Sequence, residues 1–369
     1  MWATPPQTCF RRSRTIDRAA RREVDLRFLV TGGAGFIGCN YVHRLLSRGE
    51  RAVVYDDLSR AGVRANLDWL AAEHASALEV IAGDVCDLDG VRRAARDADV
   101  IVHLAGQTAV TTSVADPLAD FRANALGALN VLEAARAAAR EPIVLYASTN
   151  KVYGGMEVLG VVEQETRYAY RDLPFGIAES QPLDFHSPYG CSKGAADQYV
   201  RDYHRIYGVR TVVFRQSCIY GPRQMGCEDQ GWLAWFMIAA LAGRPLTVYG
   251  DGKQARDVLY VEDLLDAYDA AITHVERAAG QVYNVGGGPD RILSVWAEFA
   301  PALERLLGRR LEARRADWRP GDQRVYVSDV RKAKRDLGWA PKVSVEEGLT
   351  RLLAWIEANR HLFPAAAPE

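Results

Sequence analysis

The segment from Thr31 to Gly38 reads TGGAGFIG, and its glycines suit it to hold a phosphate group. Gly33, Gly35 and Gly38 satisfy the pattern GxGxxG, while Gly32 with the last two satisfies GxxGxxG. Glycines permit a tight turn and close backbone approach, and a following helix offers free N–H groups to a pyrophosphate. A glycine pattern by itself is weak, so the prediction depends on a strand before the loop and a helix after it.

Two carboxylates, Asp56 and Asp57, end the second strand-like run, 18 residues beyond Gly38. A carboxylate there hydrogen-bonds the adenosine ribose and repels a 2′-phosphate, so the pair favours NAD over NADP. Arg60 is the one dissenting feature, because an arginine can accept that phosphate, but the carboxylates precede it. We therefore predict NAD as the cofactor, and the alternative is a glycine turn beside a solvated Asp pair.

Tyr189 and Lys193 stand at positions i and i+4, on one face of an expected helix. Thr149 lies 40 residues earlier and ends the fifth strand-like run, at the same sheet edge as the glycine loop. The spacing Tyr-x-x-x-Lys is frequent by chance. The alternative interpretation is that Tyr189 and Lys193 are two residues on the surface of a helix and that Thr149 is an unrelated threonine at a strand end.

The chain from Leu26 alternates short apolar runs with helical segments. Strands are predicted at 26–30, 52–55, 78–81, 100–104, 143–146 and 209–214. Helices are predicted at 36–48, 117–140 and 188–207. This alternation indicates βαβ units and a parallel sheet, which binds ligands at the carboxyl ends of its strands. We predict an α/β fold, a Rossmann-type doubly wound parallel sheet with a smaller C-terminal α/β substrate-binding lobe.

The alternation weakens after about Gly221, where brief strands separate helices expected at 228–241, 261–275, 294–307 and 345–359. The predicted organisation is a disordered basic extension at 1–24, an NAD-binding Rossmann domain at 25–220, a partly interleaved substrate lobe at 221–361 and a disordered tail at 362–369. The extension holds six Arg against one Asp and one Glu, and no apolar segment that would make it a secretory signal.

Charge and cysteine content exclude several classes of partner. The 46 basic and 47 acidic residues nearly cancel, which argues against a nucleic acid or an anionic membrane surface. The most apolar run, Trp232–Gly243, is too short to span a bilayer. The six cysteines form no CxxC pair, so we expect no metal site and no disulfide framework. Free thiols then indicate a cytoplasmic protein.

These features together resemble the extended short-chain dehydrogenase/reductase family, whose catalytic triad is Ser/Thr, Tyr and Lys. The resemblance implies that Thr149, Tyr189 and Lys193 are catalytic. A tyrosine has a pKa of about 10, and a nearby ammonium with a positive nicotinamide is expected to lower it. Tyr189 then takes a proton from a sugar hydroxyl, Thr149 holds the oxygen, and Lys193 also binds the nicotinamide ribose.

Cofactor contacts are expected wherever a strand ends near the glycine loop. An Asp after the third strand can reach the adenine amino group, and small residues after the fourth let the backbone pass close to the cofactor. The predicted contacts are Gly32, Gly35, Phe36, Ile37, Gly38, Asp56, Asp57, Asp84, Val85, Leu104, Ala105, Gln107, Tyr189, Lys193 and Gln216.

Five longer stretches, at 148–154, 183–199, 229–232, 252–259 and 322–325, resemble the CDP-paratose 2-epimerases (CDP-tyvelose epimerases) within that family. The resemblance implies a nucleotide-diphospho-sugar substrate, such as a CDP-hexose or deoxyhexose, and inversion at sugar C2. Relatives that dehydrate sugars carry an acid directly after the strand-end threonine, whereas Asn150 and Lys151 follow Thr149 here. Oxidation and re-reduction then remain, and hydride returned to the other face of the sugar inverts the centre.

Substrate contacts are expected mainly in the C-terminal lobe. Arginine forks match phosphate oxygens, so two arginines in matching motifs are chosen for the pyrophosphate, with surface salt bridges as the alternative. An apolar run around Val248 is expected beside the base, with plain core as the alternative. His186 also suits an ordinary loop histidine, and Gln216 is a further candidate for the sugar. The predicted substrate contacts are Asn150, His186, Gln230, Val248, Arg256 and Arg324.

Two other functions stay open at this point. One is an epimerase acting on another position or nucleotide, such as a UDP-sugar 4-epimerase. The other is a catalytically idle NAD-binding scaffold, against which the intact Thr, Tyr and Lys argue. The helices at 117–140 and 188–207 are expected to pair across a two-fold axis in a homodimer, and a tetramer stays possible.

Overall fold

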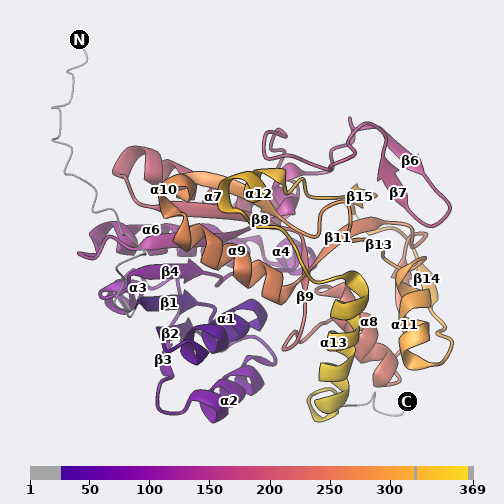
Figure 1. Cartoon of the computed structure of the whole chain (residues 1–369), viewed down its shortest axis with the longest axis horizontal. Coiled ribbons are helices and arrows are strands. Elements are labelled where there is room, and N and C mark those ends of the chain that lie inside the picture. The colour runs from indigo at the N-terminus through magenta and orange to yellow at the C-terminus, as the bar shows by residue number, and fades with distance from the viewer. Residues whose placement is uncertain (1–25, 320–321, 365–369) are drawn as a thin grey trace.

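The computed structural model describes residues 26–319 and 322–364, so the predicted extension at 1–24 lies outside it. Its centre is a seven-stranded parallel sheet in the order β12-β8-β5-β4-β1-β2-β3 (Figure 1). These strands are β1 (Arg27–Thr31), β2 (Arg51–Asp56), β3 (Glu79–Ala82), β4 (Val100–His103), β5 (Ile143–Thr149), β8 (Thr211–Gln216) and β12 (Gln281–Val285). The strand order reverses between β1 and β4, and such a switch point opens a crevice at the carboxyl ends. The predicted doubly wound α/β fold is confirmed.

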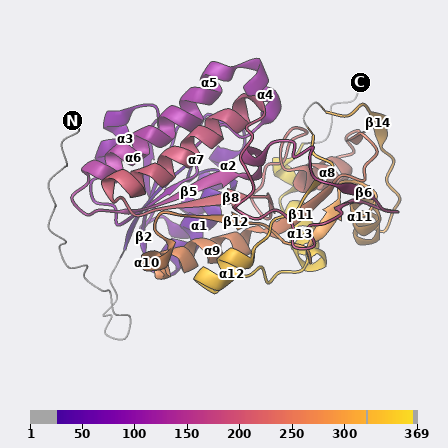
Figure 2. The ribbon, with the colours of Figure 1, turned by 90° about the horizontal axis from the view of Figure 1, so that it is seen from above.

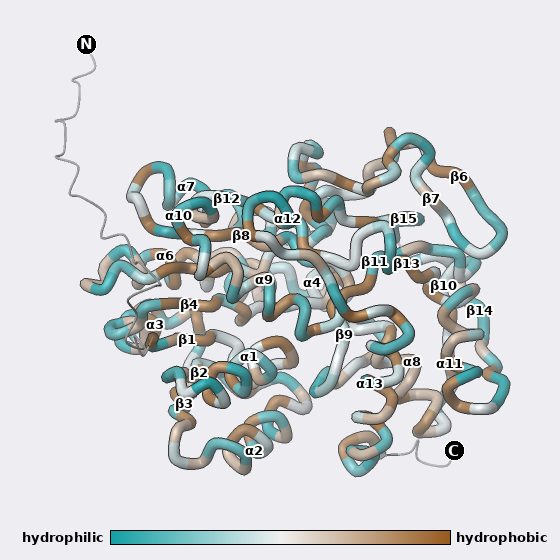
Figure 3. Tube along the Cα trace, in the orientation of Figure 1, coloured by the Kyte–Doolittle hydropathy of each residue, from teal (hydrophilic) through white to brown (hydrophobic). Residues whose placement is uncertain are grey.

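Helices cover both faces of this sheet (Figure 2). One face packs against α1 (Phe36–Ser47), α2 (Val63–His74), α9 (Val261–Thr273), α10 (Val275–Ala278) and α12 (Arg331–Leu337). The other packs against α3 (Leu88–Ala95), α6 (Gly127–Ala137) and α7 (Ser187–Tyr207). Strands buried on both faces lack alternation, which is why β4 and the first four residues of β5 are buried throughout. Figure 3 shows this contrast as hydrophobic colour along β1 and β4 and hydrophilic colour over α12.

The single helix expected at 117–140 is wrong in detail. The chain forms α4 (Val110–Ala115), α5 (Pro117–Phe121), a π-helical turn η2 (Arg122–Leu126) and then α6. A π turn widens the helix by one residue and often marks a functional segment. Here it carries Asn124, whose buried amide donates to Asp120 Oδ1 (3.0 Å) and to Ser192 Oγ of α7 (3.1 Å).

The smaller lobe is built mainly from the second half of the chain and lies beside the sheet (Figure 1). Its four-stranded sheet contains β9 (Cys218–Tyr220), β11 (Ala255–Tyr260), β13 (Ile292–Ser294) and β15 (Val325–Tyr326). Two strand pairs join it: β6 (Val161–Glu163) with β7 (Tyr168–Tyr170), and β10 (Thr247–Tyr249) with β14 (Arg314–Ala316). Its helices are α8 (Trp232–Leu241), α11 (Phe299–Leu307) and α13 (Val345–Ala358), with single turns at η3 (Asn150–Tyr153) and η4 (Arg360–Leu362).

The two parts interleave across the boundary expected at residue 220. β12 comes from the second half of the chain but pairs with β8 in the main sheet. β9 ends at Tyr220 and pairs with β11 in the lobe. The predicted tail at 362–369 begins inside the described residues, where Leu362 closes η4, and continues outside them.

A buried ion pair fixes α7 to the centre of the main sheet. Arg215 of β8 is 2% exposed and donates from Nε and Nη2 to both carboxylate oxygens of Asp197 on α7, each at 2.9 Å. Asp197 also accepts from Ser148 Oγ of β5 (2.8 Å), and Arg215 Nη1 donates to the Tyr153 hydroxyl (3.0 Å). The ion pair therefore ties one helix to two neighbouring strands and to η3.

Removing one partner of this pair should destabilise the protein strongly. Asp197→Asn leaves the Arg215 guanidinium buried without a counter-charge, and such changes cost about 3–5 kcal/mol. Asp202→Asn removes the same charge from an exposed position of α7 and should stay within about 0.5 kcal/mol of the wild type. Urea unfolding followed by circular dichroism measures both values. Equal stability of the two variants would contradict the role given to the ion pair.

Candidate active site

A cavity of about 770 Å³ opens at the carboxyl ends of β1, β2, β4, β5 and β8 and extends to the small lobe. All fifteen residues predicted to contact the cofactor, together with Thr149, lie on its wall. Segments far apart in the chain reach it because parallel strands end at one edge of the sheet. The structure therefore brings the predicted cofactor and catalytic residues into one space.

Two glycines of the loop at 32–38, Gly32 and Gly38, have no room for a side chain. Gly32 has φ +67°, and a Cβ placed on it would lie 2.7 Å from the Ala105 backbone nitrogen. A Cβ on Gly38 would overlap the Gly32 carbonyl oxygen. Gly35 then caps α1, whose first N–H groups have no partner within the helix. This bare backbone at a helix start fits a pyrophosphate group.

The carboxylates after β2 differ in their surroundings. Asp56 is buried and accepts hydrogen bonds from the Ala34 and Leu58 N–H groups, at 3.0 and 2.9 Å. Burial raises its pKa, and these two bonds lower it. A carboxylate offers about four lone-pair sites, so Asp56 retains acceptors for ribose hydroxyls. Asp57 is exposed, while Arg60 donates to Thr108 Oγ1 (3.0 Å) on the same cavity wall.

Tyr189 and Lys193 project from α7, and Thr149 ends β5 beside them. Lys193 Nζ donates to the Ala147 carbonyl at 2.6 Å and lies 4.4 Å from the centre of the Tyr146 ring. Burial lowers the pKa of Lys193 to about 7. The Lys193 side chain is therefore already hydrogen-bonded to the backbone of β5.

The protein side chains alone do not lower the pKa of Tyr189, so the lowering expected from an ammonium together with a bound nicotinamide stays a prediction. Burial raises the pKa of Tyr189, a hydrogen bond with Thr149 lowers it, and the charge of Asp120 raises it. The lysine ammonium points to the Ala147 carbonyl and does not counter the effect of burial. The protein alone therefore disfavours the charged phenolate of Tyr189, and positive charge from bound ligands would favour it.

A polar cluster behind the catalytic helix was missed by sequence reasoning. Ser192 Oγ donates to Asp120 Oδ2 at 2.6 Å, and Asn124 donates to both residues. Asp120 and Asn124 stand four residues apart inside the segment expected to be a regular helix, and nothing in that pattern predicts a π turn. The cluster holds α7 against η2, one residue from Lys193.

The predicted substrate residues divide into two groups. Gln230 lies on the cavity wall, and Asn150 is buried beside Thr149, accepting from its hydroxyl at 3.3 Å. Asn150 and the other four, His186, Val248, Arg256 and Arg324, are not among the residues that line the cavity. Val248 is fully buried in the lobe core, so the plain-core alternative describes it, and His186 is paired with Asp184 at 3.1 Å in an exposed loop.

The two arginines chosen for the pyrophosphate have protein partners. Arg256 is buried and donates to Asp322 Oδ1 (2.7 Å) and to the Gln323 carbonyl (2.6 Å). The Arg324 guanidinium lies 5.3 Å from the centre of the Tyr168 ring. Lys151 is a half-buried lysine near Arg256, and partial burial, followed by the charge of Arg256, lowers its pKa to about 8. In the sequence, Lys151 was used only to show that no acid follows Thr149, although its position just after a strand end also made it a candidate for the site.

Other wall residues were also missed. Ser217 and Cys218 directly follow Gln216, so the strand-end argument applied once more would have included them. Trp232 follows Gln230 by two residues and lies on the same wall. No sequence pattern singles out Met225, which the loop after β9 brings to the cavity.

Comparisons with known proteins give the chain its relatives. The model of the GDP-mannose 4,6 dehydratase family matches residues 29–352. A CDP-paratose 2-epimerase of Salmonella typhi is 43% identical over 337 residues, which are 89% of this chain and 99% of that protein. A dTDP-glucose 4,6-dehydratase of Xanthomonas campestris is 34% identical over 90% of this chain and 93% of its own length.

Solved structures agree with this relationship. A UDP-glucose 4-epimerase of Thermotoga maritima, solved with UDP-glucose, has a TM-score of 0.78 and 31% identity, covering 91% of this chain and all of its own. A dTDP-glucose 4,6-dehydratase of Streptomyces venezuelae, solved with NAD, has a TM-score of 0.79 and 31% identity, covering 92% of this chain and 99% of its own.

The buried lysine makes stability depend on pH. Its pKa falls from the ordinary 10.5 to about 7 on folding, so between those values the unfolded chain binds the extra proton. The free energy of unfolding should then rise with pH, by up to about 1.4 kcal/mol per unit from this group. Lys193→Met should remove that part of the slope in cofactor-free protein, measured by urea unfolding from pH 7.5 to 10.

Lys342→Met is the matched control, because Lys342 is exposed and the neighbouring Asp266 raises its pKa. That change should leave the slope between pH 7.5 and 10 as in the wild type. An unchanged slope in Lys193→Met would show that the lysine is charged throughout.

Proposed function

Because the chain belongs to the GDP-mannose 4,6-dehydratase family of extended short-chain dehydrogenase/reductases, we propose that it is an NAD-dependent epimerase acting on C2 of a nucleotide-diphospho-sugar. The proposed substrate is a CDP-sugar of the CDP-paratose or CDP-tyvelose kind. The 43% identity to a CDP-paratose 2-epimerase along nearly its whole length supports this choice.

The positions of the carboxylates that line the cavity favour epimerisation over dehydration as the proposed reaction. These carboxylates are Asp56, Asp57 and Asp84, which follow β2 and β3 at the end assigned to adenosine. After Thr149 come a buried amide, Asn150, and a half-buried lysine, Lys151. Eliminating water from a sugar needs an additional acid and base at the reacting carbons. The described wall supplies none beside the catalytic tyrosine, which suits a reaction that keeps every atom of the sugar.

The cofactor residues divide along the bound dinucleotide. The glycine loop would hold the pyrophosphate, Asp56 and Asp57 the adenosine ribose, and Asp84 with Val85 the adenine. The loop after β4, Gln216 and the Tyr–Lys pair would surround the nicotinamide half. NAD bound there would supply a reversible hydride acceptor.

The protein side chains would transfer the proton and hydrogen-bond the sugar oxygen. The Tyr189 oxygen removes the proton from the C2 hydroxyl and later returns it, while the Thr149 hydroxyl donates to the same sugar oxygen. Lys193 has three donors and spends one on Ala147, so the others can bind a ribose hydroxyl and stabilise the phenolate. The sugar turns over inside the cavity, held by its pyrophosphate, and its other face is reduced.

Substrate contacts are proposed on the lobe side of the cavity. Gln230 would bind from the cavity wall, and Asn150 would bind from its position beside Thr149. Arg256 and Arg324 would bind the pyrophosphate by exchanging their present protein contacts for phosphate oxygens, and His186 would contribute from the loop before α7.

A panel of CDP-, UDP-, GDP- and dTDP-hexoses tests the function. We expect C2 epimers from the CDP-sugar, detected by NMR of the released sugar. Tyr189→Phe should lower turnover by about 10²–10⁴-fold, because positioned acid–base groups contribute that much. Tyr199→Phe, an exposed tyrosine of the same helix, should keep full turnover. C4 epimers from a UDP-sugar would establish the 4-epimerase instead, and a chain inert toward every sugar would establish the scaffold.

We also propose that the chain forms a homodimer through the face of α4, α5 and α7. Exposed apolar side chains gather on these helices, namely Val114, Leu118, Phe121, Tyr199, Ile206 and Tyr207. A surface of this kind usually marks a protein interface. Five cysteines of the described residues are free, which favours a reducing compartment such as the cytoplasm. No described helix combines the length and apolarity that crossing a membrane requires.

Light scattering should give twice the mass of one chain at micromolar concentration. Phe121→Asp places a charge in the proposed interface and should shift the protein to monomer. Val158→Asp, which changes an exposed apolar residue outside these helices, should leave the mass unchanged. A monomeric wild type would rule the interface out.

A further inference from the structure

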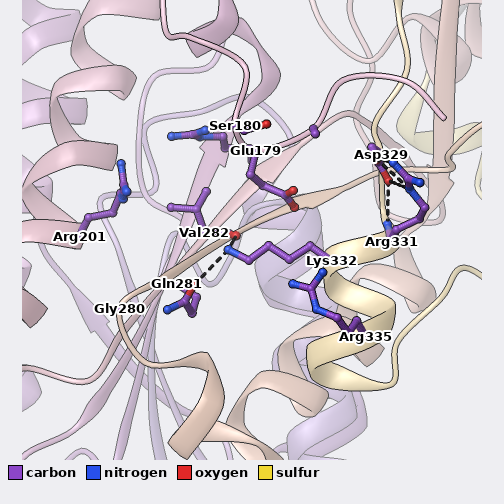
Figure 4. A pocket seen from close by; sticks show the side chains of 12 residues that line it. Glu179, Ser180, Arg201, Gly280, Gln281, Val282, Asp329, Arg331, Lys332 and Arg335 are labelled. Atoms are coloured by element: carbon purple, nitrogen blue, oxygen red, sulfur yellow. Dashed lines mark hydrogen bonds and ion pairs between the residues drawn. The ribbon is translucent and has the colours of Figure 1, made fainter. Parts of the chain in front are cut away.

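A second cavity of about 790 Å³ shares no lining residue with the first. Its walls come from the segment around Glu179, from α7, from the start of β12 and from α12 (Figure 4). Its volume falls within the roughly 300–1,000 Å³ that is usual for small-molecule sites. None of the functions discussed above uses this space.

Basic side chains dominate its wall. Three of the five, Arg215, Arg331 and Arg335, are ion-paired with Asp197, Asp329 and Asp336. Arg201 reaches the cavity from α7, whereas Lys332 and Arg335 reach it from α12 (Figure 4). Facing cations repel one another, so their convergence favours an anion between them.

Arg201, Lys332 and Arg335 keep donors for such an anion. Arg201 Nη1 donates to Gln198, whereas its Nε is buried with no hydrogen-bond partner among the described residues. Lys332 reaches across to β12, where Nζ donates to Gln281 Oε1 (3.1 Å) and the Val282 carbonyl (2.8 Å), and a third donor remains (Figure 4). Arg335 uses Nε and Nη2 on Asp336, which leaves Nη1.

Two carboxylates stand on the same wall: Asp329, which is paired with Arg331, and Glu179. Glu179 Oε1 accepts from the Asn284 N–H at 2.8 Å, and its other oxygen can accept from a ligand hydroxyl. Among the described lining residues none is aromatic, so nothing there would stack on a nucleotide base. The wall therefore suits a ligand with a compact anion at one end and hydroxyl groups at the other.

We propose that this second cavity binds a small phosphorylated polyol, such as a sugar phosphate, with its phosphoryl group between Arg201, Lys332 and Arg335 and a hydroxyl on Glu179. Arginine and lysine donors match phosphate oxygens, and charge-assisted bonds are the stronger kind. The site is independent of the proposed epimerase activity, because binding needs none of the catalytic residues.

Calorimetric titration with glucose 6-phosphate tests the site, with glucose, inorganic phosphate and AMP as comparison probes. The sugar phosphate should bind tightest. The double variant Arg201→Gln, Arg335→Gln should bind it about tenfold more weakly or worse, since two charge-assisted contacts are lost. Arg205→Gln, the same change one turn further along α7 and outside the cavity, should bind like the wild type.

Hydrogen exchange on the wild type gives a second measurement that does not depend on the variants folding. Glucose 6-phosphate should slow exchange in α12 and around 178–180 and leave the glycine loop at 32–38 unchanged. Absence of binding, equal binding of glucose, or equal binding of inorganic phosphate or AMP would overturn the proposal. So would undiminished binding by the double variant, or protection confined to the glycine loop.

Discussion

A guanidinium buried in the middle of a sheet requires a counter-charge, and the position of α7 follows from where Arg215 finds one. Asp197 lies one helical turn beyond Lys193, so pairing it with β8 also sets where Lys193 and Tyr189 stand. The same carboxylate accepts from Ser148, next to Thr149. One ion pair thus connects the helix and the strand end that carry the three residues proposed to be catalytic. Buried pairs of this kind add little net stability, but breaking one is costly, which favours a single packing.

Burial shapes the chemistry as well as the packing. It raises the pKa of Tyr189 and lowers that of Lys193 to about 7, so it acts against the charged form of both side chains. Proton transfer by the tyrosine then requires bound ligands that supply positive charge and donors close to the phenol. The side chains proposed to hold cofactor and sugar would therefore take part in the proton chemistry of Tyr189.

Much of the main sheet and of the cofactor wall could be predicted from sequence, because each of those signals is local. Apolar runs buried on both faces predict β1 and β4, and the glycines at 32–38 are required where backbone meets backbone, as Gly32 meets Ala105. The spacing of Tyr189 and Lys193 is equally local. The fold class and the family were confirmed on these grounds.

The features that were missed depend on contacts between distant segments. Asn124 in the π turn donates a hydrogen bond to a serine on another helix, and Arg256 forms its ion pair with Asp322, 66 residues away. β12 joins the main sheet from the second half of the chain, where the alternation of strands and helices had faded. The sequence predicted that Val248 contacts the nucleotide base, because an apolar run beside a site and an apolar run inside a core have the same composition.

The central claim is that hydrogen leaves and returns to the same sugar carbon without mixing with solvent. A CDP-sugar carrying deuterium at C2, converted in ordinary water, tests this directly by NMR and mass spectrometry of the product. The account predicts an inverted C2 that still carries its deuterium. A product with a solvent proton at C2 would show enolisation in place of hydride transfer and would contradict the roles given to Tyr189 and to the dinucleotide cavity.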